Sequence, residues 1–144
     1  MIEIGIKALR AGITPPEKKT EGACGFDLAS ATRGDLLLPL GKVVLVPTGI
    51  ALSIPMGYEG EVRPRSGFST KNRILMPNAP GTIDSDYRGE IFIPLLNLGD
   101  EDFVLTSGTR IAQILFKRVE TAHFVWKENL DETTRGDLGF GSTG

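Results

Sequence analysis

The feature that most constrains the fold of this chain is a series of short β-type runs separated by glycine and proline. The turns between them include Pro-Leu-Gly, Pro-Thr-Gly and Pro-Met-Gly. Short strands with turns at this spacing are typical of an all-β sandwich or jelly roll. The expected strands are Ile2–Ala8, Gly25–Ala29, Asp35–Leu38, Val43–Val46, Gly49–Ile54, Glu59–Arg63, Gly89–Leu96, Phe103–Leu105, Arg110–Arg118 and Ala122–Trp126.

Long amphipathic helical periodicity is missing. The run Arg110–Phe116 contains good helix formers, but we assign it to a strand because its neighbours are strands and Gly108-Thr109 is typical of a turn. One short helix is expected near Gly67–Asn72. The hydrophobic alternation stops at Glu128, so we expect one β-domain over residues 1–127, with residues 128–144 as its C-terminal arm and tail.

The composition excludes several classes of protein. The 144 residues are 40% hydrophobic, enough for a core, and a net charge of −2 without a basic block argues against nucleic-acid binding. The single cysteine, Cys24, allows no internal disulfide. Because the chain carries no signal peptide and no apolar stretch that could span a membrane, we expect a soluble cytoplasmic protein without a membrane partner.

The single histidine, His123, excludes a zinc-deaminase cluster and a helical HExxH zinc site. It lies in the last expected strand, and without a nearby triad signature a structural role is favoured over a catalytic one.

The last ten residues, Arg135–Gly144, combine four glycines with a guanidinium group, an aromatic ring and two hydroxyl groups. A segment so rich in glycine has little tendency to fold alone. Its side chains suit a lid that closes over a phosphorylated ligand with a flat ring.

Other segments also carry more polar chemistry than a plain β-fold needs. Pro64–Ser69 places an arginine and hydroxyl groups near a helix start, which suits an anion, although a capped helix with a surface arginine explains it equally well. Asn78–Gly89 joins two strands and combines two carboxylates, an Asn and a Tyr, each a common type in loops. Asp27 alone is also explained as a turn or surface residue. For Gln113, a satisfied inward polar group is favoured over a site residue.

Taken in order, these segments resemble the five motifs of the trimeric deoxyuridine triphosphatase (dUTP diphosphatase) family. The resemblance extends from about Gly22 to Gly144, and five motifs in the correct order are far more specific than any one. The motifs are Ala23–Leu28, Pro64–Gly67, Gly81–Glu90, Gly108–Gln113 and the tail. The chain departs from the usual family residues at Cys24, Phe26, Phe68 and Leu138, and none of these removes a reacting group.

The resemblance implies a jelly-roll subunit, a distorted β-clip-like barrel, and a homotrimer with active sites at the subunit interfaces. The implied reaction is hydrolysis of dUTP to dUMP and pyrophosphate, with Mg²⁺ held mainly by the triphosphate. This activity keeps uracil out of DNA and supplies dUMP for thymidylate synthesis.

Roles for individual residues follow from the same resemblance. Asp84 would deprotonate the water that attacks the α-phosphorus. Gln113 and Ser66 would hold the phosphate oxygens and this water, Arg65 would neutralise phosphate charge, and Asp27 would reach Mg²⁺ through water. The implied substrate-binding residues are Arg65, Ser66, Gly67, Asn78, Gly81, Thr82, Ile83, Asp84, Tyr87, Phe92, Arg135, Phe140, Gly141, Ser142 and Thr143.

The implied selectivity comes from the Asn78–Tyr87 hairpin, whose hydrogen-bonding pattern would match uracil and leave buried groups unpaired with cytosine. Tyr87 would pack under the deoxyribose and leave no room for a 2′-hydroxyl, and Phe92 would line the same pocket. In the flexible tail, Phe140 would stack on uracil, while Arg135, Ser142 and Thr143 would bind the β- and γ-phosphates.

Two alternatives stay open. A deoxycytidine triphosphate deaminase shares the fold and parts of the motifs, and would release ammonia from dCTP. A non-catalytic trimeric nucleotide-binding protein would bind nucleotide without hydrolysis. The complete hairpin and tail argue against the first alternative. The second is disfavoured because the chain keeps all of the reacting and stacking residues: Asp27, Ser66, Asp84, Gln113 and Phe140.

Overall fold

The computed structural model describes residues 1–139 of the chain. Nearly all of its regular structure is β, with one short helix. The elements are β1 (Gly5–Ala8), β2 (Phe26–Ala29), β3 (Leu36–Leu38), β4 (Val43–Pro47), β5 (Ile50–Ser53), β6 (Tyr58–Pro64), α1 (Ser66–Asn72), β7 (Ile74–Leu75), β8 (Gly81–Ile83), β9 (Phe92–Asn97), β10 (Phe103–Leu105) and β11 (Arg110–Arg118).

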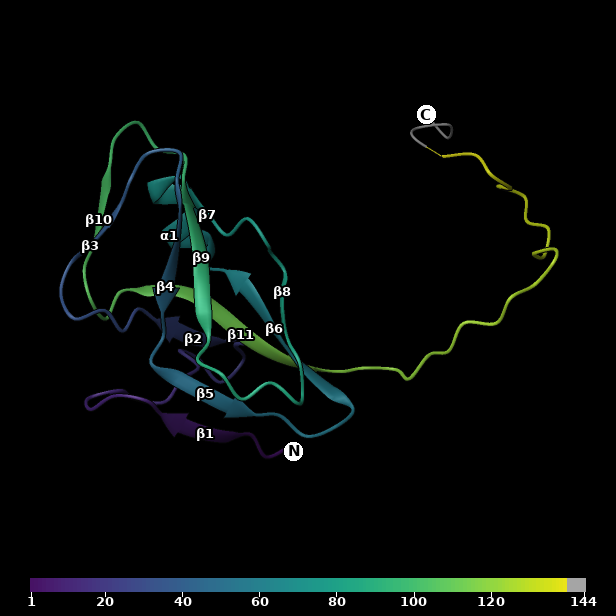
Figure 1. The fold of residues 1–144 in the computed structure, drawn as a ribbon, viewed down its shortest axis with the longest axis horizontal. Helices are drawn as coiled ribbons and strands as arrows, with labels where there is room; N and C mark the ends of the chain where they lie inside the picture. Colours follow the sequence, from purple (N-terminus) through teal and green to yellow (C-terminus); the bar gives the residue numbers. More distant parts are fainter. Residues whose placement is uncertain (140–144) are drawn as a thin grey trace.

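The strands form four small antiparallel sheets (Figure 1). A four-stranded sheet has the order β2-β11-β6-β8, and a three-stranded sheet has the order β4-β9-β7. The pairs β1-β5 and β10-β3 complete the arrangement. Within residues 1–139 these sheets do not close into one barrel, so the barrel in our sequence prediction is wrong as a description of the hydrogen bonding, while the all-β class is confirmed.

Alternating apolar side chains from these sheets form a single core. In β9 the residues Ile93 and Leu95 are buried while their neighbours are not, as expected for a strand with one face inward. Phe68, the buried residue of α1, packs edge-on against Phe103 with 6.1 Å between ring centroids. The helix therefore attaches to the core through one aromatic side chain.

Most strands lie where the sequence predicts them, and β10 and β11 have the expected bounds. The strands β7 and β8 were not predicted, because they are only two and three residues long and lie among prolines. The helix begins one residue earlier than expected, at Ser66.

The expected strand Ala122–Trp126 is wrong, because the structure has no regular element between Arg118 and residue 139. The segment leaves the end of β11 and extends away from the sheets (Figure 1). Phe124 and Trp126 are fully exposed, and His123 is exposed between them. A strand needs a partner for its backbone N–H and C=O groups, and this segment lies beside none.

No helix within residues 1–139 is both long enough and apolar enough to cross a membrane.

Candidate active site

The four-stranded sheet brings together four of the segments singled out in the sequence. The central strand β11 pairs with β2 on one side, where Gln113 lies opposite Asp27, and with β6 on the other, where Gln113 lies opposite Arg63. The end of β6 leads directly through Arg65 into α1. On the far side of β6, β8 carries the start of the hairpin.

Asp27 and two arginines form an ion-pair cluster at one end of this sheet. The Asp27 Oδ1 atom lies 2.8 Å from Arg65 Nε, and its Oδ2 atom accepts a hydrogen bond of 3.0 Å from Arg110 Nη1. Arg65 Nη1 also donates to the Arg110 carbonyl at 3.2 Å. The Asp27 side chain is only 14% exposed, whereas the arginines are more open. Two cations share one carboxylate, so the cluster carries excess positive charge.

Gln113 lies beside this Asp27–Arg65–Arg110 cluster and is held from two directions. Its Nε2 donates to the Pro64 carbonyl at 3.0 Å. On the other side is Gly25, where an added Cβ would lie 2.5 Å from Gln113 Oε1. A glycine is therefore needed at position 25, because the Gln113 amide fills the space that a side chain there would occupy. Ser66 and Gly67 are exposed in the first turn of α1, next to the same cluster.

The hairpin residues lie at a different place. Gly81, Thr82 and Ile83 form β8, and the exposed Asp84 follows directly. The Asp84 carbonyl accepts a hydrogen bond of 3.2 Å from the Tyr87 N–H, which closes the turn. The exposed Asn78 lies near Gly81, whose added Cβ would be 3.3 Å from Asn78 Nδ2.

Two aromatic residues follow the turn. Tyr87 is 43% exposed, and its hydroxyl donates to the Glu90 carbonyl at 2.9 Å. Phe92 is 45% exposed at the start of β9, opposite Pro47. Both rings therefore present an open surface close to the hairpin base.

Asp84 and the Asp27–Arg65–Arg110 cluster lie at opposite ends of the sheet. Ile83 pairs with Gly60 near the start of β6, whereas Arg65 follows Pro64 at its end. Four residue steps along a strand span about 13 Å, and Asp84 and Arg65 both lie beyond that interval. A single copy of the chain therefore does not bring Asp84 together with Arg65, Ser66 and Gln113.

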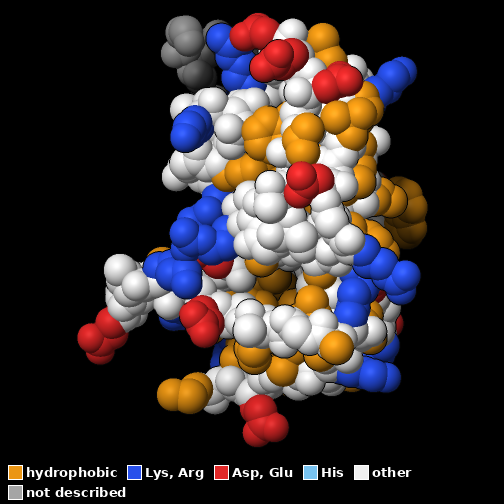
Figure 2. Space-filling view, turned by 90° about the vertical axis from the view of Figure 1, so that its left-hand side faces the viewer, with side chains coloured by type: hydrophobic (Ala, Val, Ile, Leu, Met, Phe, Trp, Pro, Cys, Tyr) orange, Lys and Arg blue, Asp and Glu red, His pale blue; other side chains and the backbone are white. Residues whose placement is uncertain are grey.

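A cavity of about 840 Å³ opens beside the cluster. Asp27 and Arg110 line it together with Arg10 and the segments 9–17, 29–33 and 107–108. The surface on the side of β3 and β10 is hollowed below a region of exposed hydrophobic side chains, with lysine and arginine nearby (Figure 2).

Sequence reasoning assigned no role to three residues that the structure connects to these segments: Arg110, Arg10 and Glu90. Arg110 lies within the fourth motif, and its position directly before Ile111-Ala112-Gln113 is the available signal. Arg10 precedes all the motifs, so the sequence offers no signal for it. In the tail, Arg135 is exposed and its Nε donates to the Leu138 carbonyl at 2.9 Å. Phe140, Gly141, Ser142 and Thr143 lie outside the described residues.

Comparison with known proteins identifies the family. The dUTPase family model matches residues 12–144. The chain belongs to the dUTPase family. The resemblance to this family is thus confirmed over nearly the whole chain. The motifs that carry the resemblance contain the residues of the sites described above.

Family relatives are similar over their full length. The chain is 51% identical over 144 residues to the deoxyuridine 5′-triphosphate nucleotidohydrolase of Leptospira interrogans, covering 99% of both proteins. It is 44% identical to that of Rickettsia prowazekii, covering 100% of this chain and 98% of that protein. The solved dUTPase of Staphylococcus bacteriophage 80alpha with dUPNHPP superposes with a TM-score of 0.91 at 25% identity, covering 100% and 99%. These family neighbours confirm the jelly-roll fold.

Proposed function

We propose that this chain hydrolyses dUTP to dUMP and pyrophosphate in the cytoplasm, which keeps uracil out of DNA and supplies dUMP for thymidylate synthesis. Its relatives carry the name of this activity, and the phage 80alpha dUTPase binds dUPNHPP. The observation that carries the proposal is the convergence of three separate segments in the Asp27–Arg65–Arg110 cluster beside Gln113. Excess positive charge next to an amide and a hydroxyl suits a triphosphate.

The reaction needs a nucleophilic water, a base and stabilisation of phosphate charge. Asp84 is exposed on a tightly closed turn and acts as the base that takes the proton from the water. Ser66 and Gln113 hold phosphate oxygens and the water, and Arg65 offsets the phosphate charge. Asn78 and the backbone of Gly81–Ile83 present their hydrogen-bonding groups to uracil, Tyr87 packs under the sugar, and Phe92 lines the pocket.

Mg²⁺ fits this site as an ion carried by the substrate. Among residues 1–139 there is no group of three or more His, Cys, Asp or Glu side chains that could hold a metal ion. Both Asp27 oxygens are paired with arginines, so Asp27 would reach the ion through its bound waters rather than ligate it directly. The ion supplies charge neutralisation on the phosphates.

The separation within one chain supports a site built from two copies. Asp84 lies more than about 13 Å of strand away from Arg65, so the Asp84 hairpin of one copy faces the Arg65 and Gln113 end of another. The assembly we propose is the homotrimer that the family implies.

Exposed apolar side chains support such self-association. On the outward face of the three-stranded sheet, Leu96 pairs with Val43 on one side and Leu75 on the other. Val43 and Leu75 are 54% and 45% exposed, and the adjacent Leu45 is 62% exposed. A continuous apolar row of this kind on a sheet face is typical of an interface.

Residues 128–144 act as an arm and lid outside the β-domain of residues 1–127. Phe140 stacks on uracil, and Gly141, Ser142 and Thr143 contact the distal phosphates together with Arg135. Closure excludes water from the reacting phosphate.

A substrate panel tests the proposed function. The protein is incubated with Mg²⁺ and each of dUTP, dTTP, dCTP and UTP, and both pyrophosphate and ammonia are measured. We expect pyrophosphate from dUTP at a rate far above the others and no ammonia. Ammonia from dCTP, or binding of dUTP without pyrophosphate release, would overturn the proposal in favour of a deaminase or a binding protein.

A further inference from the structure

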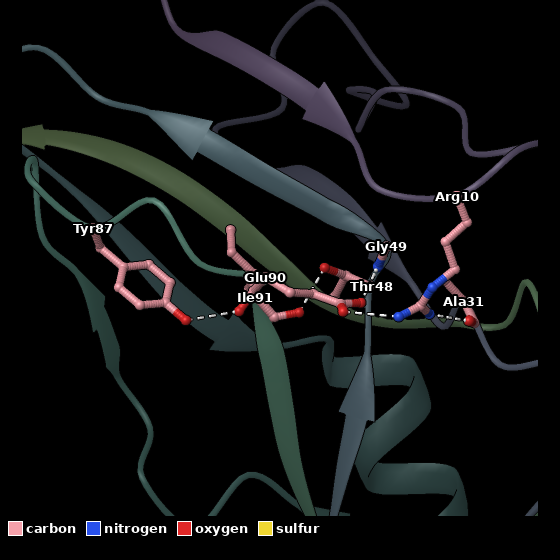
Figure 3. A network of polar contacts seen from close by, with 7 residues as sticks. All are labelled: Arg10, Ala31, Thr48, Gly49, Tyr87, Glu90 and Ile91. Atoms are coloured by element: carbon pink, nitrogen blue, oxygen red, sulfur yellow. Dashed lines mark hydrogen bonds and ion pairs between the residues drawn. The ribbon is translucent and has the colours of Figure 1, made fainter.

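A polar network at the base of the hairpin is not used by the proposed mechanism. It joins Arg10, from the N-terminal segment, to Glu90, from the end of the hairpin, with Gly49 and Ala31 as backbone partners (Figure 3). We propose that Arg10 and Glu90 are positioning residues that fix the ring of Tyr87 and thereby set the discrimination between deoxyribose and ribose. This inference rests on the proposed function.

The Glu90 carboxylate is held at both oxygens. Its Oε2 lies 2.8 Å from Arg10 Nη2, and its Oε1 accepts a hydrogen bond of 2.8 Å from the Gly49 N–H. The Glu90 side chain is 13% exposed, so these charge-assisted bonds are shielded from water on most sides. Arg10 is fixed in turn, because its Nη1 donates to the Ala31 carbonyl at 2.6 Å.

The backbone beyond Glu90 is held equally firmly. The Ile91 N–H donates to Ile50 at 3.0 Å, and the Ile91 carbonyl accepts both from the Thr48 N–H at 3.1 Å and from Thr48 Oγ1 at 2.7 Å. Ile91 is 1% exposed. The hairpin therefore ends on a fixed point of the core.

Tyr87 takes its position from this fixed point. Its hydroxyl donates to the Glu90 carbonyl at 2.9 Å, and Figure 3 shows the ring pointing toward Glu90. The ring folds back over Gly89, where an added Cβ would be 3.0 Å from Tyr87 Cε2 and closer still to the hydroxyl. A chain of contacts thus runs from Arg10 through Glu90 to the ring that faces the sugar.

Such a ring excludes a 2′-hydroxyl only while it is held in place. Loss of the ion pair with Arg10 leaves Ile91 fixed, but it removes one of the two anchors of the Glu90 side chain. Residues 87–90 can then shift relative to Ile91, and the Tyr87 ring moves with them and opens space below the sugar. A displacement of about 1 Å in a positioned group can change a rate by up to about 100-fold. We therefore expect selectivity to change more than dUTP turnover.

The test measures kcat/KM for dUTP and for UTP in Glu90→Gln, Arg10→Met and Tyr87→Phe, with Tyr87→Ala as the reference. We expect the UTP-to-dUTP ratio of kcat/KM to rise by roughly tenfold in Glu90→Gln and Arg10→Met. The same rise is expected in Tyr87→Phe, which loses only the hydrogen bond from the ring hydroxyl to the Glu90 carbonyl. The double variant Arg10→Met with Glu90→Gln should show no further rise beyond Glu90→Gln, because both changes break the same link. This ratio is unaffected by the folded fraction, since partial unfolding lowers both rates equally.

Asp100→Asn is the matched control, because it breaks the Arg73–Asp100 ion pair of 2.7 Å at an exposed site on other elements. Its ratio should equal that of the wild type. An unchanged ratio in Glu90→Gln and Arg10→Met, with a raised ratio in Tyr87→Ala, would overturn the positioning role of Arg10 and Glu90 and leave the proposed function intact. If Glu90→Gln fails to fold, an unchanged ratio in Tyr87→Phe overturns this positioning role equally. Absence of dUTP hydrolysis by the wild type would instead overturn the proposed function itself.

Discussion

At the scale of single residues, Asp84 carries the most weight. It follows β8 directly, its side chain is exposed, and its backbone carbonyl closes the turn with Tyr87. The carboxylate can thus be altered without disturbing the core. The role of Asp84 as base depends on its charge and on its place on the turn. A substitution that keeps the shape of the side chain but removes the charge separates these two contributions.

Asp84→Asn should reduce kcat for dUTP by at least about 100-fold, because the amide cannot accept the proton of the attacking water. The affinity for dUTP and the melting temperature should stay close to those of the wild type. Steady-state pyrophosphate release and calorimetric titration measure the two effects.

Asp86→Asn, two residues further along the same turn, is the control and should keep most of the activity. Near-normal turnover by Asp84→Asn would show that another group acts as the base.

At the scale of elements, the pairing of β2 with β11 positions the amide of Gln113. Register sets Gln113 opposite Asp27, and Gly25 just before β2 leaves the space that the amide fills. The second and fourth motifs meet here because Pro64 and Ala112 are paired neighbours.

Gly25→Ala should lower kcat by roughly tenfold while the protein stays folded, because the new methyl group displaces the flexible end of Gln113. Gly22→Ala is the matched control, since an added Cβ there meets nothing within 4 Å. Equal activity of the two variants, measured by pyrophosphate release, would contradict a role for the Gln113 amide.

The same sheet also predicts a dependence of stability on pH. Glu61 of β6 accepts a hydrogen bond of 2.6 Å from Lys117 of β11 and also pairs with Arg63. The hydrogen bond from Lys117, followed by that from Arg63, lowers the pKa of Glu61 in the folded protein. The resulting stabilisation is complete above the pKa of the unfolded chain, about 4.3, and is lost as the pH falls through the folded pKa.

Glu61→Gln should therefore show a smaller fall in melting temperature than the wild type between pH 6 and pH 3 (about one unit or more on each side of the unfolded pKa). Glu59→Gln, on the same face of β6, should follow the wild type. Parallel curves for Glu61→Gln and the wild type would show that these ion pairs do not couple stability to pH.

The sequence predicts these elements unevenly, for physical reasons. Alternation locates strands such as β11 because one face is buried, but β7 and β8 are too short to alternate. The motifs predict which side chains matter, including Gln113, but not that Asp27 is shared by Arg65 and Arg110. That sharing depends on register between distant strands, as does the Arg10–Glu90 pair.

At the scale of the whole molecule, the chain has a packed body and a long C-terminal segment outside it. Arg135 and Gly136 make hydrogen bonds to Leu138 and Thr133, which are neighbours in sequence. The exposed Phe124 and Trp126 earlier in the same segment show why local patterning failed at Ala122–Trp126. An apolar run predicts burial, but within the described residues the side chains of Phe124 and Trp126 are fully exposed.

Deletion of Arg135–Gly144 should preserve the melting temperature, because residues 135–139 lie outside the packed body. It should lower the dUTP activity by more than roughly tenfold, because the proposed closure of the tail over the substrate is lost. Thermal melts and pyrophosphate release measure both. A substantial drop in melting temperature would show that the tail is part of the folded structure.

The central claim is that each active site combines Asp84 of one copy with Arg65, Ser66 and Gln113 of another. Co-expression of Asp84→Asn with Gln113→Ala tests it most directly. In a random assembly, a site receives intact Asp84 in half of cases and intact Gln113 in half, so the mixture should recover about one quarter of wild-type dUTP hydrolysis while each variant alone stays nearly inactive. Pyrophosphate release that stays at the level of the single variants would contradict a site built from two chains.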